Sequence, residues 1–232
     1  MKHEVKHELI WVHGWVLGPG MWRGVTRHLP RWNHQLPDLG FFSKSIPLKV
    51  PATPWVGIGH SLGFLWLLEE MRQGRLSTEH CLGLVSINGF SRFHRGSGLT
   101  HGVHPRILRG MEVRCREDPE ALLHDFRQKA GLPMDLGPVP MATFDQERVL
   151  QGLHWLGSWD NQSILDQWNR PLLVLAGTAD TIVSPSHTRE LFAQHPKAML
   201  CWLDNGGHML PLTHPAWCLE HLLPFLERCM DL

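Results

Sequence analysis

The chain has 232 residues, a length that typically forms one domain around a sizeable hydrophobic core. Lys and Arg together number 22, as do Asp and Glu, so the formal net charge is zero. Proteins that bind nucleic acid over their surface are strongly basic, and this balance argues against that class. Hydrophobic residues form 43% of the chain and charged residues 19%, which is typical of a folded globular protein and not of a disordered one.

Three features predict a cytoplasmic protein. The first eight residues are polar and lack the apolar centre of a signal peptide. Nowhere do 18 apolar residues follow one another, so we expect no membrane span. The five cysteines contain no C-x-x-C pair and cannot all pair with one another, which favours a reducing compartment.

Short apolar runs alternate with helix-like stretches along the chain, the pattern of a mostly parallel sheet flanked by helices. We expect strands at residues 9–12, 54–58, 81–87, 171–176 and 198–203, and helices at 21–29, 61–72 and 214–229. The last helix carries its apolar residues at the spacing of one helix face. The fold class predicted from this pattern is α/β.

The pattern changes between residues 91 and 145. This stretch shows no convincing strand, is interrupted by Pro and Gly, and contains a helical segment at 119–130. We interpret it as a helical lid, inserted before the late strands within a single domain of residues 1–232. Residues 91–130 hold eight basic and five acidic side chains, so the lid is expected to be positively charged.

The strongest motif is Gly59-His60-Ser61-Leu62-Gly63, a G-x-S-x-G placed where a strand gives way to a helix. A nucleophilic serine on such a turn needs neighbours without bulky side chains, and glycines two residues before and after it meet that need. The helix that follows directs its first N–H groups toward negative charge that develops nearby. The alternative is a helix start that merely happens to be bracketed by glycines.

Serine becomes a good nucleophile when a histidine takes its proton and a carboxylate orients that histidine. Asp180, which follows a buried strand, is the predicted acid, and His208, on a loop after the next strand, is the predicted base. The chain order Ser, Asp, His is that of α/β-hydrolases. The rival acids are Asp160, Asp166 and Asp204. His60 lies in the G-x-S-x-G motif itself, where its backbone position directs it away from the role of base.

A tetrahedral oxyanion needs two N–H donors. Leu62, the residue after the serine, supplies one in this interpretation. The second is expected from the backbone of Trp15, with Gly14 allowing the chain to turn closely after the first strand. The alternative for these residues is an ordinary His-Gly turn that ends a strand.

A metal site built on His101 and His104, or on His3 and His7, is a poor alternative, because cysteine and carboxylate ligands are missing from these spacings. We therefore expect neither a metal nor another cofactor.

Taken together, these residues resemble the α/β-hydrolase superfamily over nearly the whole chain. Within it, the sequence is most similar to the pimeloyl-[acyl-carrier protein] methyl ester esterases of biotin synthesis. The similarity is carried by Val12-His13-Gly14-Trp15 with Met21-Trp22, the motif from Gly59 to Gly63, Leu84-Val85-Ser86-Ile87 with Phe90 and Phe93, Gly152-Leu153 through Asp160, Pro171 through Asp180, and Gly207-His208 with His214-Pro215.

The resemblance implies a carboxylesterase that removes the methyl group from a pimeloyl chain on acyl-carrier protein, with Ser61, Asp180 and His208 as the triad. It also implies that the segment Phe126-Arg127-Gln128-Lys129-Ala130 meets the acyl chain, so Phe126, Arg127 and Ala130 are candidate substrate-binding residues. An acidic carrier protein is the expected partner of the basic lid. The lid could equally be an ordinary solvated cap, and two other functions stay open: hydrolysis of another ester, thioester or lactone, and a slow hydrolase-fold binding protein.

Overall fold

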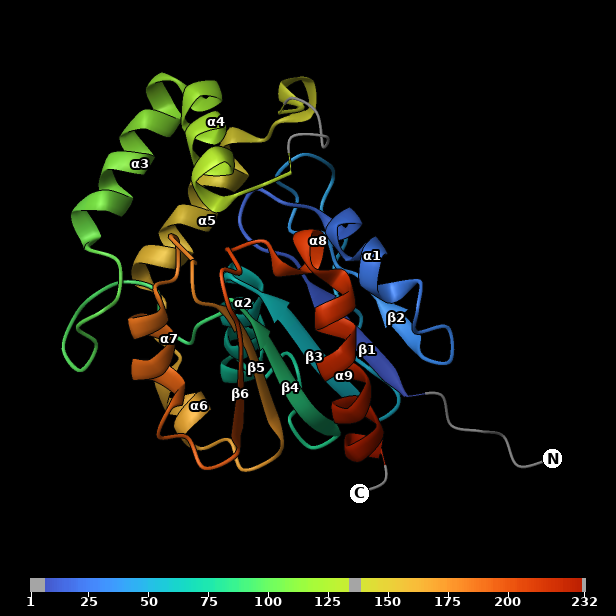
Figure 1. Ribbon diagram of the computed structural model, residues 1–232. Coiled ribbons are helices and arrows are strands. Elements are labelled where there is room, and N and C mark those ends of the chain that lie inside the picture. The colour runs from blue at the N-terminus through green and yellow to red at the C-terminus, as the bar shows by residue number, and fades with distance from the viewer. Residues whose placement is uncertain (1–6, 134–138, 231–232) are drawn as a thin grey trace.

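The computed structural model describes residues 7–133 and 139–230, and these form a six-stranded parallel sheet in the order β2-β1-β3-β4-β5-β6 (Figure 1). The strands are β1 (Glu8–Val12), β2 (Asn33–Gln35), β3 (Trp55–His60), β4 (Cys81–Ile87), β5 (Leu172–Gly177) and β6 (Ala198–Leu203). Because all the strands are parallel, their carboxyl ends meet at one edge of the sheet, where ligands of such folds bind.

Helices cover both faces of this sheet. The helices of the described residues are η1 (Pro19–Trp22), α1 (Arg23–Thr26), α2 (Leu62–Arg72), α3 (Pro105–Glu117), α4 (Pro119–Ala130), η3 (Met141–Thr143), α5 (Gln146–Ser158), α6 (Gln162–Asp166), α7 (Pro185–Phe192), α8 (Leu210–Thr213) and α9 (Pro215–Met230). In Figure 1, α9 lies in front of the sheet and α2 behind it. Within the described residues, no helix is long and apolar enough to cross a membrane.

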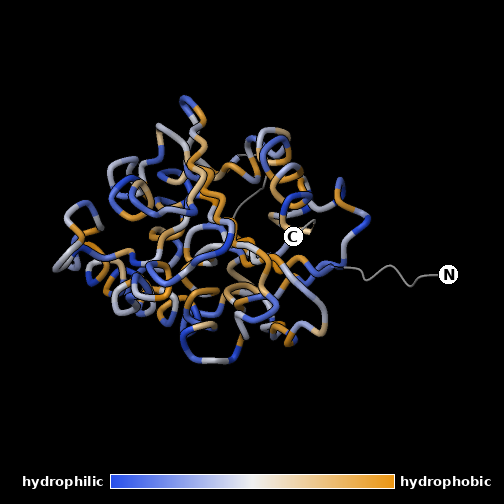
Figure 2. Tube along the Cα trace, turned by 90° about the horizontal axis from the view of Figure 1, so that it is seen from below, coloured by the Kyte–Doolittle hydropathy of each residue, from blue (hydrophilic) through white to orange (hydrophobic). Residues whose placement is uncertain are grey.

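The four central strands, β1, β3, β4 and β5, are largely apolar because both of their faces are buried. In β1, Leu9 and Trp11 pack into the hydrophobic core under α9, whereas Ile10 and Val12 pack into the core on the α2 side. Figure 2 shows hydrophobic stretches running through the middle of the molecule, with hydrophilic ones concentrated in the outer loops. This two-sided burial explains why the strands read as continuous apolar runs and not as alternating ones.

The predicted α/β class and the positions of the five predicted strands are confirmed, with bounds that differ by at most two residues. The predicted helix at 21–29 is confirmed only in part: the chain makes the 3₁₀ turn η1 and then the single turn α1, which ends at Thr26. Gly24 in this segment packs against Pro215 at the start of α9, so contact with a distant helix shapes it more than helix propensity does. The short strand β2 was not predicted, because its residues Asn33, His34 and Gln35 are polar and only pairing with β1 defines it.

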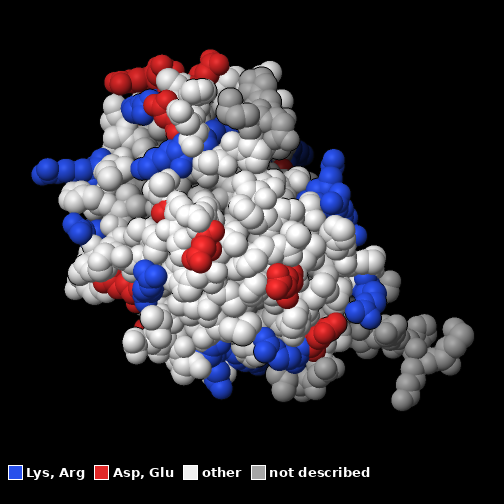
Figure 3. All heavy atoms as spheres, in the orientation of Figure 1, with Lys and Arg blue, Asp and Glu red and all other residues white. Residues whose placement is uncertain are grey.

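In the described part of the chain, the helices α3, α4, η3, α5 and α6 lie between β4 and β5. In Figure 1, α3 and α4 stand together above the sheet, and α5 connects them to it. Helix α5 begins just past residue 145, the end of the predicted lid, and packs against α3, so the helical layer continues to Ser158. Its apolar face makes this contact possible, since Val149, Leu153 and Leu156 are buried. Figure 3 shows both basic and acidic side chains on the outer surface of this region.

The turn from β3 into α2 brings the backbone at the start of α2 into direct contact with the ends of β1 and β3. Ser61 occupies this turn with φ +52°, a left-handed conformation that is strained for a residue with a side chain. A Cβ atom added to Gly63 would lie 2.0 Å from the carbonyl oxygen of Val12, and one added to Gly59 would lie 2.4 Å from Cα of Phe64. Both positions therefore require glycine, because any side chain would push α2 away from the ends of β1 and β3.

We expect Gly63→Ala to lower the free energy of unfolding by about 1–3 kcal/mol, the usual range for forcing atoms into a packed interior. The matched control is Gly110→Ala in α3, where an added Cβ meets nothing within 4 Å. There the same substitution should raise the free energy of unfolding by roughly 0.5–1 kcal/mol, because glycine inside a helix is unfavourable. Urea denaturation of both variants measures these changes. Equal free energies of unfolding for the two variants would contradict the claim that the turn requires glycine at position 63.

Candidate active site

Three side chains from three different loops meet at the carboxyl edge of the sheet. The Ser61 hydroxyl lies 3.0 Å from Nε2 of His208, and Nδ1 of His208 lies 2.8 Å from Oδ2 of Asp180. Ser61 ends the turn after β3, Asp180 follows β5, and His208 follows β6. All three are buried. The structure thus brings the predicted nucleophile, base and acid into one continuous hydrogen-bonded chain.

The surroundings of Asp180 favour its ionised form. Its Oδ1 atom accepts hydrogen bonds from the backbone N–H groups of Ile182 and Val183, at 2.8 and 2.9 Å. Burial opposes ionisation, but the charge and the hydrogen bond of His208, together with these two N–H groups, lower the pKa of Asp180 below its ordinary value. An ionised Asp180 accepts a hydrogen bond from Nδ1–H of His208, which leaves Nε2 free to accept the proton of Ser61.

The three rival acids lie elsewhere. Asp160 forms an ion pair with Arg92 at 3.0 Å, and Asp166 accepts a hydrogen bond from Gln162. Asp204 is exposed in the turn after β6. Asp180 is the carboxylate in contact with His208.

His60 is buried behind the site, and its side chain contacts the backbone carbonyl of His208, the predicted base. Its Nε2 lies 2.9 Å from the carbonyl oxygen of His208, and the two rings are 5.0 Å apart. Burial, followed by the charge of His208, lowers the pKa of His60 to about 3, so this ring is neutral at physiological pH. A neutral His60 donates Nε2–H to the His208 carbonyl and supports the loop that carries the base.

The two predicted N–H donors belong to Leu62, which follows Ser61 in the chain, and to Trp15, which lines the same cavity as Ser61. Leu62 is the first residue of α2, and Trp15 lies in the turn that follows β1. Among the described residues, neither N–H donates a hydrogen bond to the protein, so both are available to a substrate oxygen. The side chain of Trp15 is fixed on two sides, because its Nε1 donates to Val149 O at 3.0 Å and its ring meets that of Phe126 edge-on at 4.8 Å.

His13 is a residue of this turn whose part the sequence analysis missed. Its Nε2 accepts a hydrogen bond from the backbone of Leu39 at 3.0 Å, so Nδ1 carries the ring proton and donates it to Gly14 O at 2.9 Å. This bond holds the carbonyl of the peptide whose N–H belongs to Trp15. The sequence predicts the turn His13-Gly14-Trp15 as a source of an N–H donor, but it gives no role to the His13 side chain, because the Leu39 contact depends on the fold.

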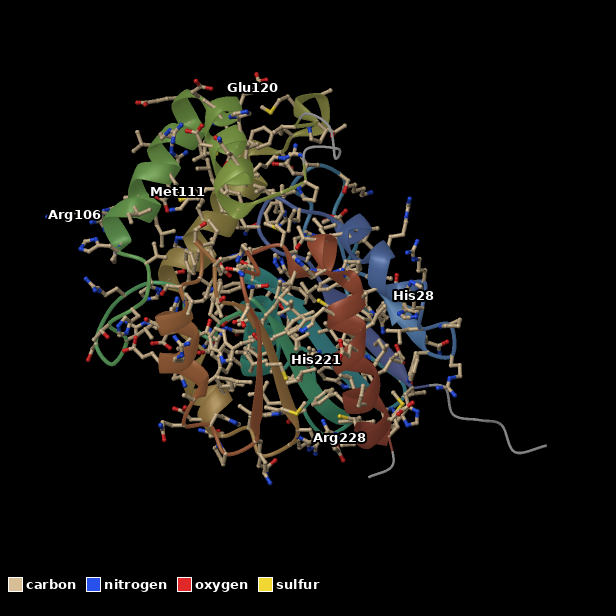
Figure 4. The ribbon with its side chains drawn as sticks, viewed as in Figure 1. His28, Arg106, Met111, Glu120, His221 and Arg228 are labelled. Carbon is tan, nitrogen blue, oxygen red and sulfur yellow. The ribbon has the colours of Figure 1, made fainter. Side chains whose placement is uncertain are left out.

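A cavity of about 520 Å³ extends from Ser61 between the sheet edge and the helices α3 and α4. Its apolar wall includes Trp15, Phe93, Val103, Ile107, Leu108, Met111, Leu122, Phe126, Leu156 and Ile182. Arg95, Arg114 and Lys129 also line it, and Arg114 forms an ion pair with Asp125 at 2.7 Å. Figure 4 shows Met111 on the side of α3 that faces the neighbouring helices, whereas Arg106 points outward from the start of α3. The cavity therefore suits an apolar chain attached to a polar or charged group.

The three lid residues predicted to bind substrate do not all reach the same cavity in the structure. Phe126 lines the Ser61 cavity, and so does Lys129 one turn along α4. Arg127 instead lines a second pocket of about 340 Å³, between α4 and the segment after β1. Ala130 is buried in the hydrophobic core on the α9 side of the sheet. Successive residues of a helix point in different directions, so a five-residue segment cannot present all of its side chains to one cavity.

Two of the histidines considered as metal ligands, His101 and His104, have other partners. His101 pairs with Glu190 at 2.9 Å, and Nδ1 of His104 accepts a hydrogen bond from Arg106 N at the start of α3. His3 lies outside the described residues. Within residues 7–133 and 139–230, no three His, Cys, Asp or Glu side chains are grouped to hold a metal ion. All five cysteines are unpaired.

Comparison with known proteins identifies relatives along the whole chain. No model of a known protein family matches. The pimeloyl-[acyl-carrier protein] methyl ester esterase of Stenotrophomonas maltophilia is 26% identical over 247 residues, which cover 95% of this chain and 94% of the relative. The esterase of the same description from Xanthomonas axonopodis is 26% identical and covers 94% of each chain.

Solved structures show the same architecture. An esterase from Exiguobacterium antarcticum superimposes with a TM-score of 0.82 at 14% identity, covering 95% of this chain and 92% of its own. A bromoperoxidase from Bacillus anthracis gives 0.82 at 18% identity, covering 97% and 93%. The chain has the α/β-hydrolase fold and is a distant, full-length homologue of the pimeloyl-[acyl-carrier protein] methyl ester esterases.

Proposed function

We propose that this protein is a serine carboxylesterase that hydrolyses the methyl ester of pimeloyl-acyl-carrier protein. The observation that carries the hydrolase chemistry is the hydrogen-bonded chain from Ser61 through His208 to Asp180, at 3.0 and 2.8 Å, at the end of a largely apolar cavity. The choice of substrate is supported by the full-length similarity to esterases of that description.

In the first half of the reaction, Nε2 of His208 takes the proton of Ser61 while the serine oxygen attacks the ester carbonyl. The new oxyanion accepts hydrogen bonds from the N–H groups of Trp15 and Leu62, and the start of α2 adds favourable electrostatics. Asp180 stabilises the imidazolium form of His208. His208 then returns the proton to the leaving oxygen, so methanol departs and the acyl group remains on Ser61.

In the second half, water replaces the alcohol. His208 takes a proton from this water, which attacks the acyl-enzyme, and the same two N–H groups hold the second oxyanion. Collapse of this intermediate breaks the bond to Ser61, and the serine oxygen recovers its proton from His208. The products are the free carboxylic acid and the unmodified enzyme, with atoms and protons balanced and no cofactor needed.

The lid provides the features that a carrier-bound substrate needs. The apolar wall of the cavity, which includes Met111 and Phe126, suits the methylene chain. On the outer side of α3, Arg106 and Arg109 are exposed, and basic side chains stand out there in Figure 3. Exposed arginines of this kind attract an acidic carrier protein.

We expect Ser61→Ala to lower kcat for every ester by about 10⁶-fold, the typical effect of removing the nucleophile of a serine hydrolase. The measurement compares methyl pimeloyl-acyl-carrier protein with a short p-nitrophenyl ester, and circular dichroism checks that the variant is folded. Hydrolysis of the carrier-bound ester by the wild-type protein, absent in the variant, supports the proposal. Hydrolysis of the small ester alone would indicate another ester or thioester as substrate, and full activity of Ser61→Ala would refute the mechanism.

A second test addresses the carrier protein. The double variant Arg106→Glu with Arg109→Glu should raise KM for the carrier-bound ester by roughly tenfold at low salt and leave the p-nitrophenyl ester unaffected. The difference in KM between this variant and the wild-type protein should become smaller at high ionic strength, because salt screens exposed charges. The matched control is Lys197→Glu with Arg228→Glu, two exposed cations remote from the cavity at the opposite end of β6. Equal effects of the two double variants would argue against docking on α3.

A further inference from the structure

Asp180 has four hydrogen-bond partners, two on each carboxylate oxygen. Oδ1 accepts from the backbone of Ile182 and Val183, and Oδ2 accepts from Nδ1 of His208. The fourth partner is the side chain of Asn88, whose Nδ2 lies 2.8 Å from the same Oδ2 atom. Two donors, one from the imidazole of His208 and one from an amide, therefore converge on the oxygen that orients the base.

Asn88 is held rigidly at this point. It follows β4 directly, and its backbone N–H donates to Leu175 O of β5 at 2.8 Å. Its φ of +48° lies in the left-handed region, which asparagine tolerates better than most residues with a side chain. The residue is 1% exposed. A constrained backbone and complete burial leave the amide little freedom to turn away from Asp180.

The hydrogen-bond partners also fix the orientation of the amide. Nδ2 faces two acceptors, Asp180 Oδ2 and the carbonyl oxygen of Gly207 at 3.3 Å, so a flipped amide would set oxygen against oxygen. Oδ1 of Asn88 is buried without a hydrogen-bond partner among the described residues. An unpaired buried oxygen is unfavourable, and its presence here indicates that the donor side of the amide determines the orientation.

We propose that Asn88 is a positioning residue of the active site, whose amide holds Asp180 in line with His208 and ties that carboxylate to the loop carrying the base. Asn88 is not among the residues that line the Ser61 cavity, and it acts through Asp180. The inference rests on the proposed hydrolase function.

The variant Asn88→Gly tests this role, because glycine keeps the left-handed backbone and removes only the amide. We expect kcat for a p-nitrophenyl ester to fall about 10- to 100-fold, the loss associated with one hydrogen bond to a charged group, while KM stays unchanged. The downfield proton NMR signal of His208 Nδ1–H should move upfield or broaden, because Asp180 is then less well fixed. A merely structural role would not change this signal.

The matched control is Asn205→Gly. Asn205 also has a left-handed backbone, with φ +58°, but it is exposed, and its backbone N–H donates a hydrogen bond to Oγ1 of Thr178. This variant should keep the kcat and the NMR signal of the wild-type protein. If Asn88→Gly does not fold, Asn88→Asp replaces it, because aspartate retains the shape and turns the donor into an acceptor that repels Asp180 at pH 8.

The outcomes separate the two proposals. Wild-type protein that hydrolyses neither ester would overturn the proposed function. If the wild-type protein is active and Ser61→Ala is not, a folded Asn88→Gly variant with unchanged kcat and an unchanged His208 signal would overturn the role of Asn88 alone. A lowered kcat with unchanged KM and a shifted signal, seen in Asn88→Gly and not in Asn205→Gly, would support it.

Discussion

The structure of the site depends on the direct contact between the start of α2 and the ends of β1 and β3. Without side chains at Gly59 and Gly63, the helix approaches until an added Cβ at Gly63 would lie only 2.0 Å from Val12 O. Ser61 lies in the turn at this contact with φ +52°, and Leu62 begins α2 directly after it. This backbone contact thus determines where the serine and the first N–H group of α2 lie.

Two neighbouring histidines differ because their surroundings differ. His60 is enclosed without a carboxylate contact, so burial keeps it neutral, and it donates to the backbone of His208. His208 contacts Asp180, whose charge is maintained by backbone N–H groups and by the Asn88 amide, and it is therefore the ring suited to carry a transient positive charge. With 17 histidines in the chain, residue type alone could not make this distinction.

The helices between β4 and β5 have an apolar side and a basic side. Their inner side is apolar where Met111, Leu122 and Phe126 line the cavity, and their outer side carries the exposed arginines of α3. Trp15 connects this layer to the sheet, because its indole binds α5 through Val149 O and packs on Phe126 of α4. The lid and the turn that follows β1 are therefore in direct contact through this one side chain.

The sequence by itself determined the α/β class, the five apolar strands and the serine, aspartate and histidine at the sheet edge, because burial and glycine requirements leave local patterns in the chain. Tertiary structure alone decided the rest. β2 exists through pairing with β1, and the direction of each side chain on α4 sends Phe126 into the cavity and Ala130 into the core. The Asn88 amide reaches Asp180 across 92 positions of the sequence, because adjacent parallel strands bring their carboxyl ends together. Such contacts depend on distances between segments, which no local pattern of residues records.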